Sequence, residues 1–163
     1  ARDRSHGFAH DRVDAEHPER FARAPRIAAH AMRRVGMRRV ELRLAHERAE
    51  LAVVNDQRGA PTSAGAIALG VSQGLDKPVS GLYHMTAAGE TTWFEFARRI
   101  LADDPHREGQ VCREIRPITT AEYPTPAKRP ANSRMSNDKL AAAFDVRIGG
   151  WREGLAEAMS GLE

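Results

Sequence analysis

One short stretch of this chain, residues 55–63, carries side chains suited to polar recognition of a ligand. It combines a carboxylate that accepts hydrogen bonds with an amide and a hydroxyl that both donate and accept them. A glycine adds backbone freedom, and a proline fixes φ just ahead of a predicted helix. The candidate binding residues here are Asp56, Gln57, Gly59, Pro61 and Thr62. A plain turn that caps a helix explains the same residues, so the sequence leaves both interpretations open.

The elements on either side explain why a ligand is expected at this stretch. An apolar run at residues 51–54 predicts a buried strand, and apolar residues at three- and four-residue spacing predict a helix that begins at Ala64. In open α/β sheets, ligands bind outside the carboxyl ends of the strands, where such loops lie. The apolar face of this helix would carry Ala64, Ile67, Ala68, Val71 and Leu75.

A second polar loop, residues 123–134, follows a predicted strand at residues 114–118. Its prolines predict an extended path. Arg129 suits a diphosphate, since a guanidinium can bond two oxygens at once, and Asn132 and Ser133 are further candidate contacts. Asn132 and Ser133 could equally brace the loop itself. Because the carboxyl ends of parallel strands lie on one side of a sheet, both loops are expected to face one ligand.

The remaining pattern predicts an α/β fold, in which helices alternate with short parallel strands. Helices are expected at residues 26–50, 64–75, 92–103, 136–144 and 151–159, and strands at residues 51–54, 81–86 and 114–118. Thr92 and Glu95 match a capping box at the start of the third helix. Ser136 or Asn137 can cap the fourth helix, and the first is expected to break near Gly36, where its phase slips.

Residues 1–25 differ from the rest, because large apolar side chains are sparse there. Such a segment cannot bury enough surface to offset its ordering entropy, so we expect an atypical extension that is disordered or weakly helical. His6 and His10 would share one helix face, but they and His17 lack a further ligand set, so solvated histidines are favoured over a metal site. Residues 26–163 form the second predicted unit.

Composition and missing motifs narrow the function classes. The formal net charge is +3, but acidic residues are interspersed with the basic ones, so nucleic acid is not expected as a partner. No apolar run approaches the roughly 20 residues of a membrane span, and the lone Cys112 fits a reducing cytoplasm. Glycine-rich phosphate loops, common zinc patterns and the G-x-S-x-G elbow are missing. We therefore predict no catalytic, cofactor-binding or metal-binding residues in this chain.

Five segments carry a specific pattern, in order along the chain. They are residues 56–62 (D-Q-R-G-A-P-T), 81–85 (G-L-Y-H-M), 89–97, 123–133 and 151–155. Together they resemble the dTDP-4-dehydrorhamnose reductases, which are NADPH-dependent sugar-nucleotide reductases of the extended short-chain dehydrogenase/reductase superfamily. The resemblance implies a Rossmann-like fold of which this chain holds the C-terminal, substrate-binding part.

Full members of that family reduce dTDP-4-dehydro-L-rhamnose to dTDP-L-rhamnose, so the resemblance implies a dTDP-sugar as ligand. Those proteins also carry a glycine-rich NADPH loop and a catalytic Tyr-x-x-x-Lys pair, which this chain lacks. Tyr123 and Lys128 are five residues apart in the proline-rich loop, so they cannot share a helix face as that pair does. We therefore expect a truncated, inactive substrate-binding part that takes no NADPH by itself.

Two alternatives to an enzyme stay open. A non-catalytic module that binds a sugar-nucleotide would use the two polar loops as its site. An interaction module would use strand edges and apolar faces that a missing Rossmann sheet leaves exposed, and would associate with itself or with a complementing subunit. The sequence is equally consistent with a truncated gene product, a shifted reading frame and a degenerate paralogue.

Overall fold

A computed structural model describes residues 37–160, with side chains described from Glu41 onward. Outside this part of the chain lie the predictions for residues 1–25, for the break near Gly36 and for the histidines at positions 6, 10 and 17. Within it, no helix has the length and apolar content that a membrane span needs.

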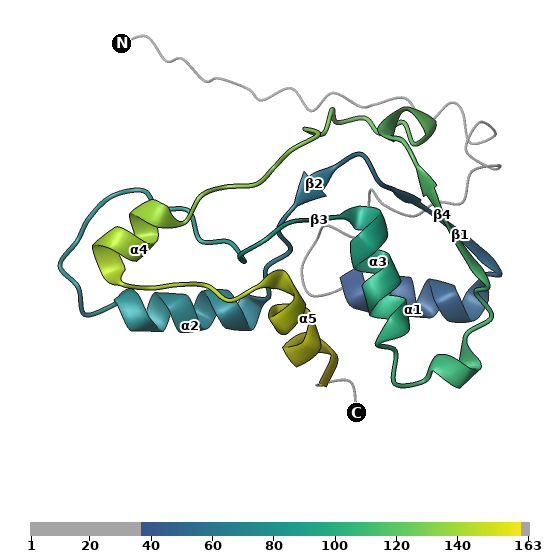
Figure 1. Ribbon diagram of the computed structural model, residues 1–163, viewed down its shortest axis with the longest axis horizontal. Coiled ribbons are helices and arrows are strands. Elements are labelled where there is room, and N and C mark those ends of the chain that lie inside the picture. The colour runs from purple at the N-terminus through teal and green to yellow at the C-terminus, as the bar shows by residue number, and fades with distance from the viewer. Residues whose placement is uncertain (1–36, 161–163) are drawn as a thin grey trace, which may run out of the picture.

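Helices alternate with short strands along the described part of the chain, which confirms the α/β class. In chain order the elements are α1 (Met37–Glu47), β1 (Glu50–Val54), β2 (Arg58–Gly59), α2 (Ala64–Gly74), β3 (Thr91–Thr92), α3 (Trp93–Ala102), β4 (Glu114–Ile118), α4 (Asp138–Phe144) and α5 (Trp151–Ser160), with 3-10 turns at Arg107–Gly109 and Thr120–Glu122. Figure 1 shows α1, α3, β1 and β4 at one end of an elongated molecule and α2 and α4 at the other, with α5 between them.

Strands β1 and β4 form a two-stranded parallel sheet. The register pairs Glu50 with Glu114 at one end and Val54 with Ile118 at the other. The polar segments that follow the two strands therefore leave the sheet at the same end, as the sequence predicts.

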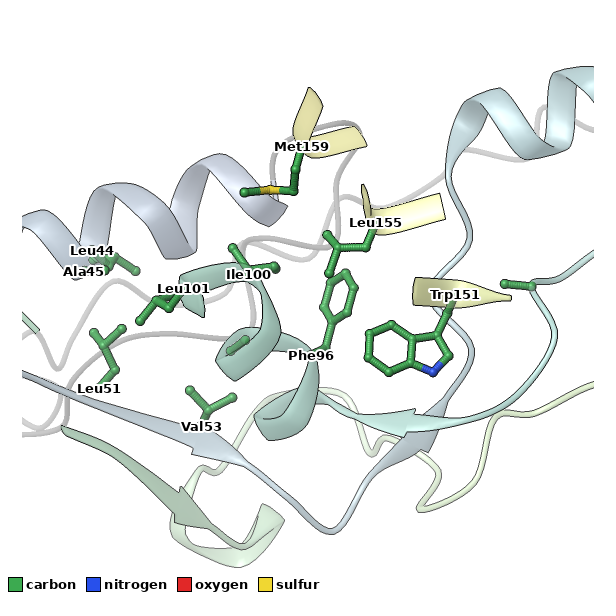
Figure 2. Close-up of a cluster of buried hydrophobic side chains, with 12 residues drawn as sticks. Leu44, Ala45, Leu51, Val53, Phe96, Ile100, Leu101, Trp151, Leu155 and Met159 are labelled. Atoms are coloured by element: carbon green, nitrogen blue, oxygen red, sulfur yellow. The ribbon is translucent and has the colours of Figure 1, made fainter. Parts of the chain in front are cut away.

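The main hydrophobic core packs helices α1, α3 and α5 against strand β1 (Figure 2). Helix α5 contributes Trp151, Leu155 and Met159, which recur every four residues and therefore lie on one face. The rings of Phe96 and Trp151 meet edge to face with their centroids 5.9 Å apart. Ile100 of α3 is fully buried in the same cluster. Burial of each large apolar side chain of this kind stabilises the fold by about 1.5–3 kcal/mol.

A side-chain cap begins helix α3 where the sequence places it. The hydroxyl of Thr92 accepts a hydrogen bond from the Glu95 backbone N–H at 3.2 Å, which is one half of the predicted capping box. The Glu95 carboxylate instead pairs with Arg98 at 3.0 Å. At α4 the N-cap residue is Asn137, which makes no side-chain cap hydrogen bond, while Oγ of the preceding Ser136 accepts from the Asp138 N–H at 3.0 Å.

The prediction of a strand at residues 81–86 is wrong. That segment joins no sheet in the described part of the chain. The side-chain amide of Asn137 bonds the Thr86 backbone in place of a neighbouring strand. Its oxygen accepts from the Thr86 N–H at 3.1 Å, and its nitrogen donates to the Thr86 carbonyl. Tyr83 and Met85 pack against a small cluster that includes α4. The apolar run is therefore held by side chains rather than by strand pairing.

Helix α2 forms where the sequence predicts it, but it packs through a glycine. A Cβ atom on Gly70 would lie 2.7 Å from Ile148 Cδ1, so the helix backbone approaches its neighbour closely. The larger apolar side chains point elsewhere, since Ile67, Val71 and Leu75 are 39%, 47% and 73% exposed. The helix face that carries these periodic apolar residues therefore lies on the surface of the described part of the chain.

One carboxylate on α1 is buried with an oxygen that bonds none of the described residues. Glu41, on α1, is 7% exposed, and its Oε2 atom makes no hydrogen bond in the described part of the chain. Burial raises the pKa of this carboxyl to about 7, because the charged form is poorly solvated there. Since the folded pKa is raised, the protein loses stability as the pH rises from the ordinary carboxyl pKa toward 7.

We predict that Glu41→Gln stabilises the protein at pH 8 and leaves its stability nearly unchanged at pH 4. A shift from 4.5 to about 7 corresponds to about 3 kcal/mol once the carboxyl is ionised. Urea unfolding at both pH values measures the difference, and Glu108→Gln, at an exposed position, is the control. A gain of the same size at both pH values would contradict the buried-charge explanation.

Candidate functional site

The two polar loops lie side by side beyond the carboxyl end of the β1–β4 sheet. Strand β2 pairs antiparallel with β3 and also bridges to the second loop at Asn132. The Arg58 N–H donates to the Ala131 carbonyl at 2.8 Å, and the Ser133 N–H donates to the Arg58 carbonyl at 2.9 Å. The loops are therefore neighbours in space, as parallel pairing of their strands requires.

A single threonine ties Asp56 and Gln57 to the segment after β4. Thr120 Oγ1 donates to Asp56 Oδ1 at 2.6 Å, and the Thr120 N–H donates to both carboxylate oxygens. The same hydroxyl oxygen accepts from Gln57 Nε2 at 3.0 Å. Gln57 Oε1 accepts in turn from Trp93 Nε1 at 3.2 Å. These polar groups hold the loops together, so most of their bonding capacity is used within the protein.

The Thr120 bonds also lower the pKa of Asp56. The Thr120 hydroxyl is the largest cause, and the Thr120 backbone N–H is the second. Asp56 is therefore an anion at neutral pH. A carboxylate repels phosphate oxygens but accepts hydrogen bonds from sugar hydroxyls, so Asp56 suits the sugar end of a ligand better than a diphosphate.

Thr62, Ser133 and Gly59 fix the packing of the loops. Thr62 Oγ1 accepts from the Ala87 N–H at 2.8 Å and donates to the carbonyl two residues before it. Ser133 Oγ donates to the Arg58 carbonyl at 3.1 Å. A Cβ on Gly59 would lie 3.0 Å from Ser133 Oγ, so the missing side chain lets the loops meet.

Asn132 and Arg129 differ in the hydrogen bonds that their side chains make within the described part of the chain. Asn132 Oδ1 accepts from the backbone N–H and the Nε of Arg134, at 3.1 and 3.2 Å. Arg129 is exposed, and the described residues offer it neither a hydrogen bond nor an ion pair. Pro61 is half-buried. The bracing considered for Asn132 and Ser133 is present, while direct ligand contacts of the eight candidate residues stay a prediction.

A groove lies beside these loops, between the turn at residues 89–90 and helix α4. Its volume is about 670 Å³, within the range of small-molecule sites. It is lined by residues 87–90, 132, 134–138, 141 and 146–148. Asn132 is the one sequence-predicted binding residue on its wall.

Glu90 holds two arginines at the edge of this groove. Its Oε1 accepts from Arg58 Nη1 at 2.5 Å, and its Oε2 accepts from Arg134 Nη1. The Glu90 carbonyl accepts from Trp151 Nε1 at 3.1 Å, which anchors the turn to the main core. Gly89, at φ +81°, supplies the left-handed conformation that the turn needs. Because one carboxylate serves two guanidinium groups, this cluster keeps an excess positive charge.

Sequence reasoning missed four charged residues of this region: Arg58, Glu90, Arg134 and Arg147. Arg147 lines the groove and is exposed, and within residues 37–160 it makes no hydrogen bond or ion pair. Its neighbours Val146 and Ile148 are buried. That alternation of apolar and charged residues is the local signal that could have placed Arg147 on an open surface.

A family profile matches most of the chain. The profile described as the RmlD substrate binding domain matches residues 30–163. The chain belongs to the RmlD substrate binding domain family. The dTDP-4-dehydrorhamnose reductases of Escherichia coli K12 and Burkholderia thailandensis are 39% identical over 128 residues and 43% identical over 126 residues. These matches cover 74% and 70% of this chain and 42% of each relative.

Solved structures give the same fold. The dTDP-4-dehydrorhamnose reductase of Bacillus anthracis, in complex with NADP, has a TM-score of 0.68 at 27% identity, and covers 76% of this chain and 42% of its own. The reductase from Clostridium acetobutylicum has a TM-score of 0.67 at 32% identity, and covers 77% of this chain and 43% of its own. The suspected family is confirmed, and the chain spans well under half the length of the relatives it matches.

Within residues 37–160, the loop before α2 differs from the glycine-rich loops that bind dinucleotide phosphates. Such sites need a glycine-rich loop and free amides at a helix N-terminus. The loop before α2 holds one glycine, Gly59, which packs against Ser133. Ser63 Oγ accepts from the Ala66 N–H at 3.1 Å, so the start of α2 is already capped. Within residues 37–160, no group of three His, Cys, Asp or Glu side chains is placed to hold a metal ion.

We predict that Thr120→Val raises the pKa of Asp56 toward its ordinary value, because the strongest donor to the carboxylate is lost. Since the folded pKa is depressed, these bonds stabilise the protein above the ordinary Asp pKa, and that contribution is lost as the pH falls through the folded pKa. The variant should therefore lose a few tenths to about 1 kcal/mol at pH 7 and nothing in strong acid.

An NMR titration of the Asp56 carboxyl carbon measures the pKa, and urea unfolding measures the stability. Thr125→Val is the control, because the Thr125 hydroxyl bonds the Ala127 carbonyl and not Asp56. An unchanged Asp56 pKa in Thr120→Val would show that the hydroxyl is not the cause of the shift.

Proposed function

We propose that this chain is the sugar-nucleotide-binding part of a dTDP-4-dehydrorhamnose reductase, and that a dTDP-sugar binds in the groove beside Glu90. The observation that carries the proposal is the pair of arginines, Arg134 and Arg147, on the wall of that groove. The ligand class follows from the named activity of the relatives, which act on dTDP-4-dehydrorhamnose.

The two arginines suit the diphosphate of such a ligand in complementary ways. Arg134 is held in place by Glu90 and by Asn132, so little conformational entropy is lost when it meets a phosphate. Arg147 has no competing partner among the described residues. Each guanidinium carries five N–H donors, and Arg–phosphate pairs are frequently bidentate.

The loop residues predicted from the sequence support this wall. Ser133 and Asn132 fix the backbone of Arg58 from the second loop. Arg58 in turn holds the Glu90 carboxylate, which orients Arg134 toward the groove. The motif residues would then act as positioning groups, and the arginines would contact the ligand.

Binding without reduction is the role proposed for this chain by itself. Tyr123 packs against a small cluster of β1 and β4 side chains, and Lys128 is exposed in the loop beyond it, so the two form no proton-donating pair on one helix face. NADPH, the hydride donor expected for the family, has no fitting site in the described residues. The lone, half-buried Cys112 agrees with the expected reducing cytoplasm.

We expect no oxidation of NADPH when the purified chain is mixed with NADPH and dTDP-4-dehydro-L-rhamnose. The reason is that the sequence predicts neither a cofactor site nor a proton donor in this chain. Absorbance at the NADPH band measures turnover, and the full Escherichia coli reductase is the positive control. Turnover above a protein-free blank, retained after further purification, would contradict the proposal.

We expect dTDP-L-rhamnose to bind the chain in isothermal titration calorimetry, and Arg147→Ala to weaken that binding by about tenfold or more. Hydrogen bonds to charged groups contribute about 1.5–3 kcal/mol, which corresponds to that loss. The matched control is Arg113→Ala, an exposed arginine outside the groove, which should bind as the parent does.

Three results distinguish binding in the groove from no binding and from binding at another place. No heat from a parent protein that melts cooperatively would remove the binding proposal. Equal losses for Arg147→Ala and Arg113→Ala would remove the groove as its location. A larger loss for Arg129→Ala would place the diphosphate at the proline-rich loop, as the sequence alone predicts.

A further inference from the structure

The turn at residues 89–90 places one carboxylate between two guanidinium groups. Glu90 Oε1 accepts from Arg58 Nη1 at 2.5 Å, and Glu90 Oε2 accepts from Arg134 Nη1. The side chains of Arg58 and Arg134 are 59% and 48% exposed, and that of Glu90 is 35% exposed. Ion pairs so open to water contribute little to folding stability. The position of this carboxylate therefore matters more for what the groove binds than for how firmly the chain folds.

The charges at the groove leave only a small positive excess. The guanidinium groups of Arg134 and Arg147 line it, and that of Arg58 lies at its edge through Glu90. The lining residues also include two carboxylates, those of Glu90 and Asp138. Asp138 Oδ2 accepts from Ser136 Oγ at 2.7 Å, and it bonds neither groove arginine. Glu90 is therefore the carboxylate that directly opposes anion binding at Arg134.

A phosphate on Arg134 would share the guanidinium with Glu90. Arg134 Nε donates to Asn132 Oδ1 at 3.2 Å and its Nη1 donates to Glu90, while its Nη2 group bonds none of the described residues. A phosphate that bonds Nη2 then lies on the same planar group as the carboxylate. Like charges at so short a range repel, and the repulsion grows with each charge on the phosphate.

Two classes of diphosphate differ in that charge. In a sugar-nucleotide the diphosphate is esterified at both ends, so each phosphate carries one negative charge. The terminal phosphate of a free nucleoside diphosphate has a second ionisation with a pKa of about 6, as in other phosphate groups bound through one oxygen. At pH 8 the free nucleoside diphosphate therefore carries one negative charge more than the esterified form.

We propose that Glu90 is a specificity-determining residue, which makes the groove select diphosphates esterified at both ends over free nucleoside diphosphates. The carboxylate repels the additional charge of the free diphosphate, and the esterified ligand lacks that charge. The groove can then bind a dTDP-sugar in the presence of dTDP, which shares its base and deoxyribose. The inference rests on the proposed binding of a dTDP-sugar in this groove.

The test compares dTDP with its terminal methyl ester by isothermal titration calorimetry at pH 8. The two ligands differ by one charge and neither carries rhamnose. The parent chain is expected to bind the ester about fivefold or more tightly than dTDP, because one additional charge meets Glu90. In Glu90→Gln this preference is expected to fall to about twofold or less, mainly through tighter binding of dTDP.

Glu90→Gln changes the charge with little change of shape. The backbone carbonyl of residue 90, which accepts from Trp151 Nε1, is retained, so the turn stays anchored. Looser positioning of Arg134 would weaken both ligands alike. The ratio of the two dissociation constants therefore reports the charge effect and not a structural one.

The matched control is Asp138→Asn, which removes one carboxylate from the same wall without touching the arginines. It is expected to keep the preference for the ester within about twofold of the parent value, because Asp138 bonds no guanidinium of the cluster. Equal losses of preference in the two variants would show that the net charge of the wall decides, and would overturn the role of Glu90. A parent chain that binds dTDP as tightly as the ester would overturn it as well.

A second variant tests the same role from the opposite direction. Arg58→Gln removes one of the two cations that offset Glu90, while the backbone bonds of Arg58 to Ala131 and Ser133 remain. The preference for the ester is expected to rise by about twofold or more, since the carboxylate is less neutralised. A fall in preference would contradict the proposal.

Parallel titration with dTDP-L-rhamnose separates this inference from the binding proposal. No heat with a parent chain that melts cooperatively would remove the binding proposal, and the role of Glu90 with it. Binding of dTDP-L-rhamnose without a preference for the methyl ester over dTDP would remove the role of Glu90 alone.

Discussion

Parallel pairing of β1 with β4 is the constraint on which the candidate site depends. The strands pair from Glu50 and Glu114 to Val54 and Ile118, so the chain leaves both of them at the same end. Thr120 lies only two residues beyond the end of β4, and there it bonds the loop that follows β1. Without the parallel register, the two polar loops would lie at opposite ends of the sheet and could not share a wall.

Trp151 connects the hydrophobic core to the charged edge of the groove. Its ring packs against Phe96 in the core, while its indole N–H donates to the Glu90 carbonyl at 3.1 Å. Its backbone N–H bonds the Ala88 carbonyl at 3.2 Å. The turn that carries Glu90 is thereby fixed by the same residue that begins α5. Burial of an aromatic side chain thus supports the position of a carboxylate that binds two arginines.

Local patterns predicted most of the fold, because the signals lie within a few residues of one another. The Thr92 cap and the four-residue spacing in α5 act within single turns of helix. The charged cluster of the site depends instead on contacts between Glu90 and arginines 32 and 44 residues away, which no local spacing encodes. The strand prediction for residues 81–86 was wrong for a related reason. An apolar run fits any extended segment, and the distant Asn137 decides what holds it.

Helix α2 and the groove lie on either side of one small packed unit. Ile148 lines the groove, and its Cδ1 atom would lie 2.7 Å from a Cβ placed on Gly70 of α2. Protein interiors are close-packed and transmit displacements, so a shift of α2 reaches Ile148 and the groove wall beside Arg147. A displacement of α2 and a ligand in the groove would therefore act on the same few side chains. In the described part of the chain, the groove is thus supported by a helix whose apolar residues Ile67, Val71 and Leu75 are exposed.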